Sequence, residues 1–232
     1  MKSSAFKTIV ALMTMTLLLQ DCGQQKKMAD AHEKNNRESP ASEKSDDKFI
    51  ETDSEGIAKP LGIRSGIVEY IYSGDKTGKS TQYFDDYGMK SATYVDIESE
   101  DGDSKVWTVS IGEDQYLWDP SSPDQAMKMK NPVIKMVMES SEGDMLFHTE
   151  QIYEQLGLRE SGTEMFKGKE CIVFKGEIGK VLIWKGLMMK SELKMGEVVS
   201  RQEATSIKTN VPVDGKYFRI PDNITFTEIP GF

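Results

Sequence analysis

A long stretch of short apolar segments, each cut by a glycine, constrains this chain more than any other feature. It covers residues 163–208, and single glycines interrupt it at near-regular intervals. Glycine adopts positive φ without a steric penalty, so this spacing is typical of tight turns between antiparallel strands. The stretch therefore predicts an antiparallel meander around which the rest of the chain folds.

Residues 187–194 alternate most clearly within this meander. One side of an extended chain would carry Leu187, Met189 and Leu193, and the other side would carry Met188, Lys190, Glu192 and Lys194. A period of two with one apolar and one charged side predicts a sheet that has one face in water.

Charge and cysteine content exclude some classes of protein. The chain has 232 residues, a formal net charge of −9, a pI of about 4.9 and no basic cluster. An acidic chain of this kind argues against a nucleic acid as partner. The two cysteines, Cys22 and Cys171, are too few for a disulfide framework.

Residues 1–21 have the features of a secretion signal peptide. Lys2 and Lys7 give a positive start, and residues 8–19 form an apolar run. This run is too short to span a bilayer core of about 30 Å, but it has the length of a signal core. The sequence therefore predicts export of the chain.

A cysteine directly follows this apolar run. The sequence Leu19-Gln20-Asp21-Cys22-Gly23 resembles the lipobox of bacterial lipoproteins. The resemblance implies a diacylglyceryl group on the Cys22 sulfur and cleavage just before it, although Asp21 departs from the small residue that the pattern prefers. Gly23 is not the acidic residue that retains some such lipoproteins at the inner membrane, which favours the outer membrane. Cleavage after Ala29-Asp30-Ala31 and an uncleaved anchor are the alternatives.

Residues 22–60 and 61–232 differ sharply in composition. The first part is dominated by Lys, Glu, Asp, Ser, Asn and Gln, with almost no large apolar residue before Phe49. Such a composition buries too little apolar surface to offset the entropy of ordering. We expect a lipidated Cys22 with a disordered polar tether over residues 22–60 and one folded domain over residues 61–232.

The domain combines expected strands with expected helices. Strands are predicted over residues 62–73, over 79–84 and 89–97 around a turn at 85–88, and over 106–111 and 115–118. Ser122-Pro123 and Asn131-Pro132 resemble a helix N-cap followed by the first helical residue, and they predict helices over 123–129 and 133–139. A third helix is predicted over 149–156 with Gly157 as its stop. A turn and an edge strand over 218–226 end the chain, so the predicted class is α+β.

Two local patterns and the order of elements resemble a known superfamily. The segment 184–192, a bulky then basic strand pair around Gly186, and the ending Phe218-Arg219-Ile220-Pro221 are similar to the periplasmic lipoprotein-carrier superfamily, with its LolA/LolB-like fold. The resemblance covers residues 61–232. It implies a strongly curved, unclosed antiparallel half-barrel with short helices over its concave face, and no catalytic signature accompanies it.

The resemblance also implies a hydrophobic ligand between sheet and helices. Lipid or lipoprotein carriage or sensing would follow, with the membrane as partner through the lipid anchor and no cofactor. The expected lining is Val133, Ile134, Met136, Val137 and Met138 from the helices, with Leu187, Met189 and Leu193 from the sheet. The alternative is a structural or interaction module whose core is filled by side chains.

Other chemistries find little support in the sequence. His148 is the only histidine of the domain, and Cys171 lies within an apolar run, so we expect no enzyme site. No three or four ligands have the spacing of a zinc site. The chain has 14 methionines, and thioethers fill core gaps, line adaptable pockets or bind Cu(I). Copper binding is therefore the most distant alternative, and no metal residue is assigned.

Overall fold

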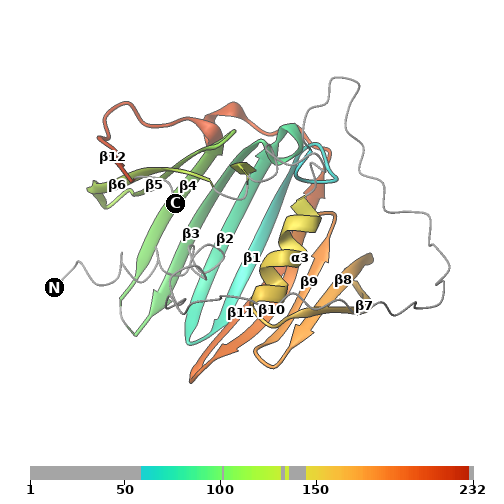
Figure 1. Cartoon of the computed structure of the whole chain (residues 1–232). Coiled ribbons are helices and arrows are strands. Elements are labelled where there is room, and N and C mark those ends of the chain that lie inside the picture. Colours follow the sequence, from blue (N-terminus) through green and yellow to red (C-terminus); the bar gives the residue numbers. More distant parts are fainter. Residues whose placement is uncertain (1–58, 101, 132–133, 136–144, 230–232) are drawn as a thin grey trace, which may run out of the picture.

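The computed structural model describes residues 59–100, 102–131, 134–135 and 145–229. Within these residues twelve strands form one sheet in the order β12-β6-β5-β4-β3-β2-β1-β11-β10-β9-β8-β7, which has two ends and is not closed (Figure 1). The strands are β1 (Gly66–Gly74), β2 (Lys76–Asp85), β3 (Lys90–Ser99), β4 (Ser104–Ile111), β5 (Asp114–Asp119), β6 (Ser122–Lys130), β7 (Arg159–Phe166), β8 (Lys169–Gly176), β9 (Gly179–Trp184), β10 (Leu187–Met195), β11 (Val198–Thr209) and β12 (Thr227–Glu228).

Two antiparallel meanders make up this sheet, together with the short strand β12, which pairs in parallel with β6. The first runs from β1 outward to β6, and the second runs from β7 inward to β11. They join where β11 pairs with β1, which places Ile207 opposite Val68. The second meander confirms the prediction from the glycine spacing of residues 163–208, and β2–β3 and β4–β5 are the two predicted hairpins.

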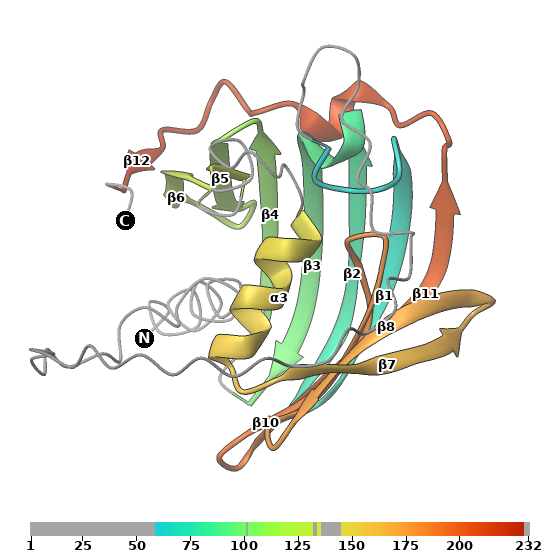
Figure 2. The same cartoon turned by 45° about the vertical axis from the view of Figure 1, so that its right-hand side comes forward.

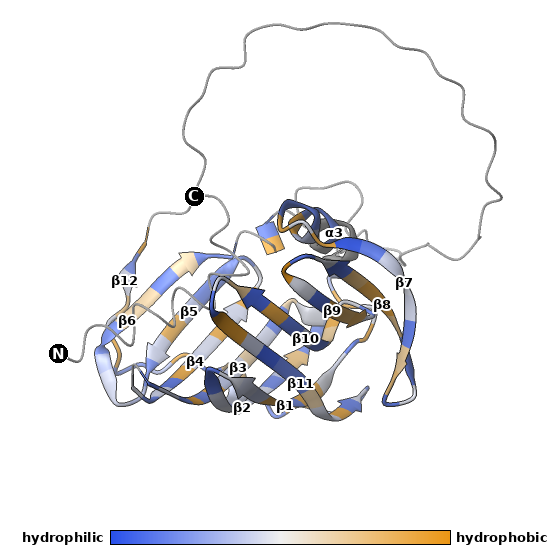
Figure 3. Ribbon diagram, turned by 90° about the horizontal axis from the view of Figure 1, so that it is seen from below, coloured by the Kyte–Doolittle hydropathy of each residue, from blue (hydrophilic) through white to orange (hydrophobic). Residues whose placement is uncertain are grey.

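The sheet is strongly curved, with α3 (Met145–Gln155) on its concave side (Figures 2 and 3). Register shifts contribute to the curvature, among them one in the β1–β11 pair at Glu69/Tyr70 and one in the β9–β10 pair at Met188/Lys190. An extra residue in one strand of a pair increases the local twist and bends that strand.

Helix α3 confirms the third predicted helix, although it begins at Met145 rather than near residue 149. Gly157 ends it with a φ of 75°, and the Leu158 N–H donates to the Tyr153 carbonyl at 2.8 Å. A left-handed glycine followed by such a bond is a common helix stop. Tyr153 and Leu158 pack on the sheet in a helix cluster. Its buried members are Tyr153, Leu158, Phe174, Val181 and Ile183.

The predicted α+β class is wrong. The described chain is mostly β, with α3 and two 3₁₀ turns, η2 (Asp86–Gly88) and η3 (Gly215–Phe218), as its helical elements. Among the described residues, α3 is the α-helix with assigned bounds, so the expected set of short helices over the concave face is not found there. The predicted helix over 133–139 lies largely outside the described residues; Ile134 and Lys135 are helical, and the Ile134 N–H donates to Asn131 Oδ1 at 3.2 Å.

The predicted helix over 123–129 is also wrong, because this segment is strand β6. Its residues pair with β5, with Met127 opposite Leu117 and Lys128 opposite Tyr116. Pro123 lacks an N–H, but it sits near the start of the strand beside a register shift, where a ladder bond is not required. Sheet pairing thus overrides the local Ser122-Pro123 signal.

The prediction of an edge strand in the C-terminal segment is also wrong. The predicted edge strand over 218–226 is irregular, and only Thr227 and Glu228 pair, in parallel with β6. Instead, the segment packs its apolar residues against β2–β5 in an outer cluster. This cluster has Ala92, Val109, Trp118, Ala126 and Phe218 as buried members, with Tyr83, Trp107, Tyr116, Val213, Tyr217, Ile220, Ile224 and Phe226 packed against them.

A central cluster forms around β1, β10 and β11. Its buried members are Leu61, Ile63, Val68, Tyr70, Phe84, Cys171, Val173, Leu182, Leu187, Met189 and Ala204. Leu61 and Ile63 come from the segment before β1, which lies on the same concave side as α3 (Figure 2). The cluster members on β1 and β2, which include Val68 and Phe84, therefore face the concave side, and the outer cluster is on the convex side.

Candidate functional site

The concave side continues from the central cluster across β2–β6. Phe84 belongs to the central cluster, and every second residue from it along β2 faces the same way, as do the residues paired with these on β3 to β6. We call this set the uncharged face. It consists of Ser80, Gln82, Ser91, Thr93, Val95, Ile97, Ser104, Val106, Thr108, Ser110, Gln115, Leu117, Met127 and Met129.

The uncharged face has no ionisable side chain, whereas the convex side of the same strands carries many. Charged residues on the convex side include Lys79, Asp85, Lys90, Asp96, Glu98, Lys105, Asp114, Lys128 and Lys130. Ion pairs there include Lys105 with Asp96 at 3.4 Å and Lys128 with Asp114 at 3.6 Å. On the concave side Lys76 is charged, but it is the first residue of β2 and lies at the edge of the pattern.

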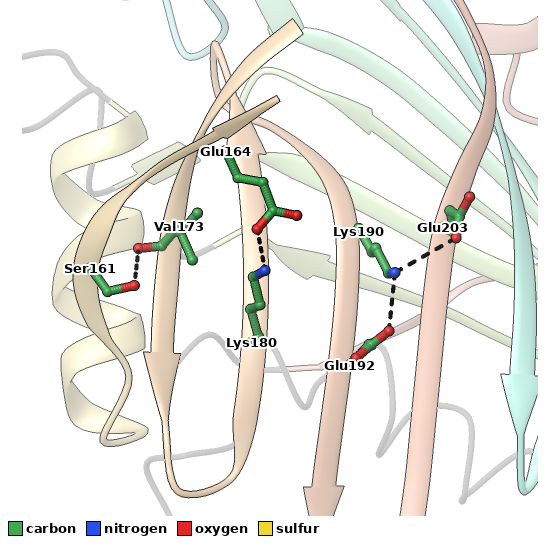
Figure 4. Close-up of polar contacts among 7 residues, drawn as sticks. All are labelled: Ser161, Glu164, Val173, Lys180, Lys190, Glu192 and Glu203. Carbon is green, nitrogen blue, oxygen red and sulfur yellow. Dashed lines mark hydrogen bonds and ion pairs between the residues drawn. The ribbon is translucent and has the colours of Figure 1, made fainter. Parts of the chain in front are cut away.

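The same separation of charge continues on β9–β11. Lys190 of β10 contacts Glu192 at 3.1 Å and Glu203 of β11 at 4.0 Å, and Lys180 pairs with Glu164 (Figure 4). These ion pairs are partly exposed, so each contributes little to stability. Their main consequence is that charge is kept on one side of these strands.

The aliphatic residues of the uncharged face are buried, whereas Met127 and Met129 are partly exposed. Val106 is 1% exposed, Leu117 3%, Val95 4% and Ile97 6%. None of them belongs to the three clusters that the described residues form. This part of the concave side is thus apolar and shielded from water, yet distinct from the packed clusters.

Several polar side chains of this region are hydrogen-bonded to neutral groups. The Tyr70 hydroxyl donates to Gln82 Oε1 at 3.1 Å, Tyr72 Oη lies 3.2 Å from Ser80 Oγ, and Gln115 Nε2 donates to Ser110 Oγ at 3.3 Å. Burial raises the pKa of the Tyr70 hydroxyl, and the neighbouring Tyr72 adds to the rise. Burial also raises the pKa of Tyr72. The environment therefore disfavours negative charge.

The residues predicted to line a ligand site fall into separate places. Leu187 and Met189 are buried in the central cluster, and Leu193 packs against the helix cluster. Ile134 is 4% exposed. Cys22, Val133, Met136, Val137 and Met138 lie outside the described residues, so their roles stay predictions.

The structure also shows where the residues considered for catalysis or metal binding lie. Cys171 is buried in the central cluster, where burial and then the Glu164 charge raise its thiol pKa. His148 lies in α3. Met127 and Met129 share the uncharged face because β6 is a strand. Among the described residues no group of three or more His, Cys, Asp or Glu is arranged to hold a metal ion.

Sequence reasoning missed the uncharged face as a unit. Its signal was present in the alternation of Thr93, Val95 and Ile97 with Tyr94 and Asp96 along β3. The common face of several strands becomes visible only when their register is known.

Comparisons with known proteins give a fold likeness and no more. No protein-family model matches the chain, and no curated protein matches it. Among solved structures, an uncharacterized conserved protein from Thermus thermophilus has 9% identity and a TM-score of 0.48, with 75% of this chain and 96% of that chain covered.

Two further structures are more distant. The MucA/MucB complex of Pseudomonas aeruginosa has a chain with 14% identity and a TM-score of 0.38, covering 75% of this chain and 62% of that chain. LprF from Mycobacterium bovis has 7% identity and a TM-score of 0.32, covering 71% and 91%. Likenesses at these scores carry no argument about function. Separately, no helix in the described part of the chain is both long and apolar enough for a membrane span.

Proposed function

We propose that this chain is an exported, non-enzymatic envelope protein that binds a lipid or another hydrophobic ligand on the uncharged face. The observation that carries the proposal is the separation of charge on β2–β6. Small hydroxyl residues such as Ser80, Thr93 and Ser104 lie among Val95 and Val106 on this face, whereas a face that only fills a core needs no hydroxyl groups. Such a surface suits a flexible apolar chain with few polar atoms.

The energetics of such a ligand are favourable. Removing apolar surface from water stabilises a complex by about 25 cal/mol per Å², so one buried acyl chain is enough for useful affinity. The uncharged face offers Val95, Ile97, Val106 and Leu117 as the apolar contact surface. Its polar side chains are neutral, and several of them are bonded to neutral neighbours, as Gln82 is to Tyr70 and Gln115 to Ser110. A ligand bound on this face therefore buries no charged side chain of the face without a partner.

The proposal assigns the remaining predicted residues as follows. Cys22 carries the lipid anchor, and residues 22–60 tether the domain to a membrane, with the outer membrane as the preferred site. Val133, Ile134, Met136, Val137 and Met138 are kept as proposed ligand contacts, and of these Ile134 is 4% exposed. The Asn131 side chain accepts a hydrogen bond from the Ile134 N–H at 3.2 Å.

Native mass spectrometry tests this function. The chain is expressed in bacteria without residues 1–46 and its mass is measured before and after extraction with organic solvent. We expect extra mass of lipid size that extraction removes, and the extract identifies the ligand class. A bare mass that stays unchanged after incubation with a lipid extract would contradict the proposal.

A second candidate function is a structural or interaction module with a filled core. The near-complete burial of Val106 and Leu117 favours it, because packed side chains and a bound ligand shield these residues equally well. The same mass measurement separates the two candidates. A bare protein supports the filled core and directs the search to a protein partner.

A further inference from the structure

We propose that the ligand of the uncharged face is a neutral acyl ester and that ionised fatty acids are excluded from it. The inference rests on the proposed function and specifies its ligand. It starts from the pairing of β2–β6, which places no carboxylate, amine or guanidinium between Ser80 and Leu117 on this side.

Among the described residues of β2–β6, the uncharged face offers an ionised headgroup no charged partner. A carboxylate that leaves water needs a cation or several N–H donors, because an uncompensated buried charge is strongly unfavourable. On β2–β6 the cations nearest in sequence, such as Lys79, Lys105 and Lys128, lie on the convex side. A fatty acid would therefore have to bind in its protonated form.

An ester carbonyl, by contrast, matches the side chains that are present. Hydroxyl groups donate hydrogen bonds to a neutral carbonyl oxygen without any charge to neutralise. Thr93 stands between Gln82 and Thr108 in the middle of the face. The raised pKa values of Tyr70 and Tyr72 at the neighbouring β1 agree with surroundings that accept neutral groups and disfavour anions.

Among the described residues of β2–β6, the rim of this face offers one cation, Lys76, at the first position of β2. It is half-buried and already takes part in an interaction of its own. It is also separated from Ser80 by Gly78 along the same side of the strand. Lys76 is therefore not placed to neutralise a headgroup in the middle of the face.

Two probes that differ only in their headgroup test the inference: cis-parinaric acid and its methyl ester, whose fluorescence rises in apolar surroundings. Each is titrated at pH 8 into the full chain, which is held soluble by an amphipathic polymer, with the polymer alone as blank. We expect the ester to bind and the acid to bind about tenfold or more weakly, since its carboxylate stays ionised. Equal affinities overturn the inference while leaving the proposed function intact, and they would point to Lys76 as the partner. Binding of neither probe contradicts the proposed function itself.

A matched pair of variants tests whether the preference for the ester arises on the uncharged face. Thr93→Lys puts a cation on the uncharged face, whereas Thr81→Lys puts the same cation on the convex side of the neighbouring strand. We expect Thr93→Lys to reverse the preference in favour of the acid and Thr81→Lys to leave the ester preference unchanged. The same shift in both variants would overturn the assignment of the preference to this face.

Discussion

The two faces of β2–β6 bury side chains in different ways. On the convex side, the C-terminal segment covers an aromatic surface, and Tyr217 stacks on Tyr83 with ring centroids 3.8 Å apart. Phe226 meets Trp118 edge to face at 6.1 Å. On the concave side the uncharged face has small hydroxyl and aliphatic residues that belong to none of the three described clusters. The comparison shows how one set of strands can carry a fixed core on one side and a surface suited to a ligand on the other.

The largest expected effect comes from truncating neighbours on opposite faces of β5. Trp118→Ala removes a buried ring from the outer cluster and should lower the free energy of unfolding by about 3–5 kcal/mol. Leu117→Ala, on the uncharged face, should cost about 2 kcal/mol or less in lipid-free protein, because a ligand surface is less tightly packed. Urea unfolding measures both. Equal losses would mean that the uncharged face is a packed core.

Enlarging neighbours on β3 sharpens the comparison. Ala92→Phe overfills the outer cluster and should destabilise the fold by about 1–3 kcal/mol. Thr93→Phe points to the uncharged face, so it should change stability by less than about 1 kcal/mol and reduce the lipid that co-purifies with the chain. Thermal unfolding and mass spectrometry report the two quantities. Lipid content that falls only in Ala92→Phe would reverse the assignment of faces.

Alkaline pH distinguishes the tyrosines of the two sides. Burial, followed by the hydrogen bond with Tyr217, raises the pKa of Tyr83 to about 12, and burial also raises the pKa of Tyr70. Because the pKa of an unfolded tyrosine is about 10, this contribution to stability is complete below pH 10 and is lost as pH rises through the folded pKa values. The free energy of unfolding should therefore depend less steeply on pH, between pH 9 and about 12, in Tyr70→Phe. The same change should be smaller in Tyr83→Phe, because Tyr83 is more exposed. A steeper curve in Tyr70→Phe would contradict the sign.

The smallest effect is expected at the surface ion pair of Lys105 and Asp96. The side chains are 54% and 43% exposed, so Lys105→Ala should change the free energy of unfolding by less than about 0.5 kcal/mol. High salt should remove the difference between variant and parent. A larger loss would mean that the convex charges do more than keep this side in water.

The sequence predicted the elements that are encoded by neighbouring residues. The turn at residues 85–88 is an example, since the Asp85 side chain accepts a hydrogen bond from the Asp86 N–H at 2.8 Å. The stop of α3 at Gly157 is also local. Each of these signals lies within a few residues, so long-range contacts were not needed to interpret it.

The sequence failed where distant strands decide the structure. Ser122-Pro123 resembles a helix start, but pairing of β6 with β5 makes the segment a strand. The C-terminal segment looks like an edge strand, yet Phe218 and Phe226 pack on aromatic residues of distant strands. The uncharged face has the same origin, because Thr93 and Thr108 become neighbours only through the register of β3 and β4.

Photo-crosslinking tests the central claim most directly. The chain is produced in bacteria with p-benzoylphenylalanine in place of Thr93 or, as the control for the convex side, in place of Tyr94, and it is irradiated and analysed by mass spectrometry. We predict a covalent lipid adduct at position 93 and none at position 94. An adduct only at position 94, or a crosslink from position 93 to the chain itself without any lipid, would contradict the account.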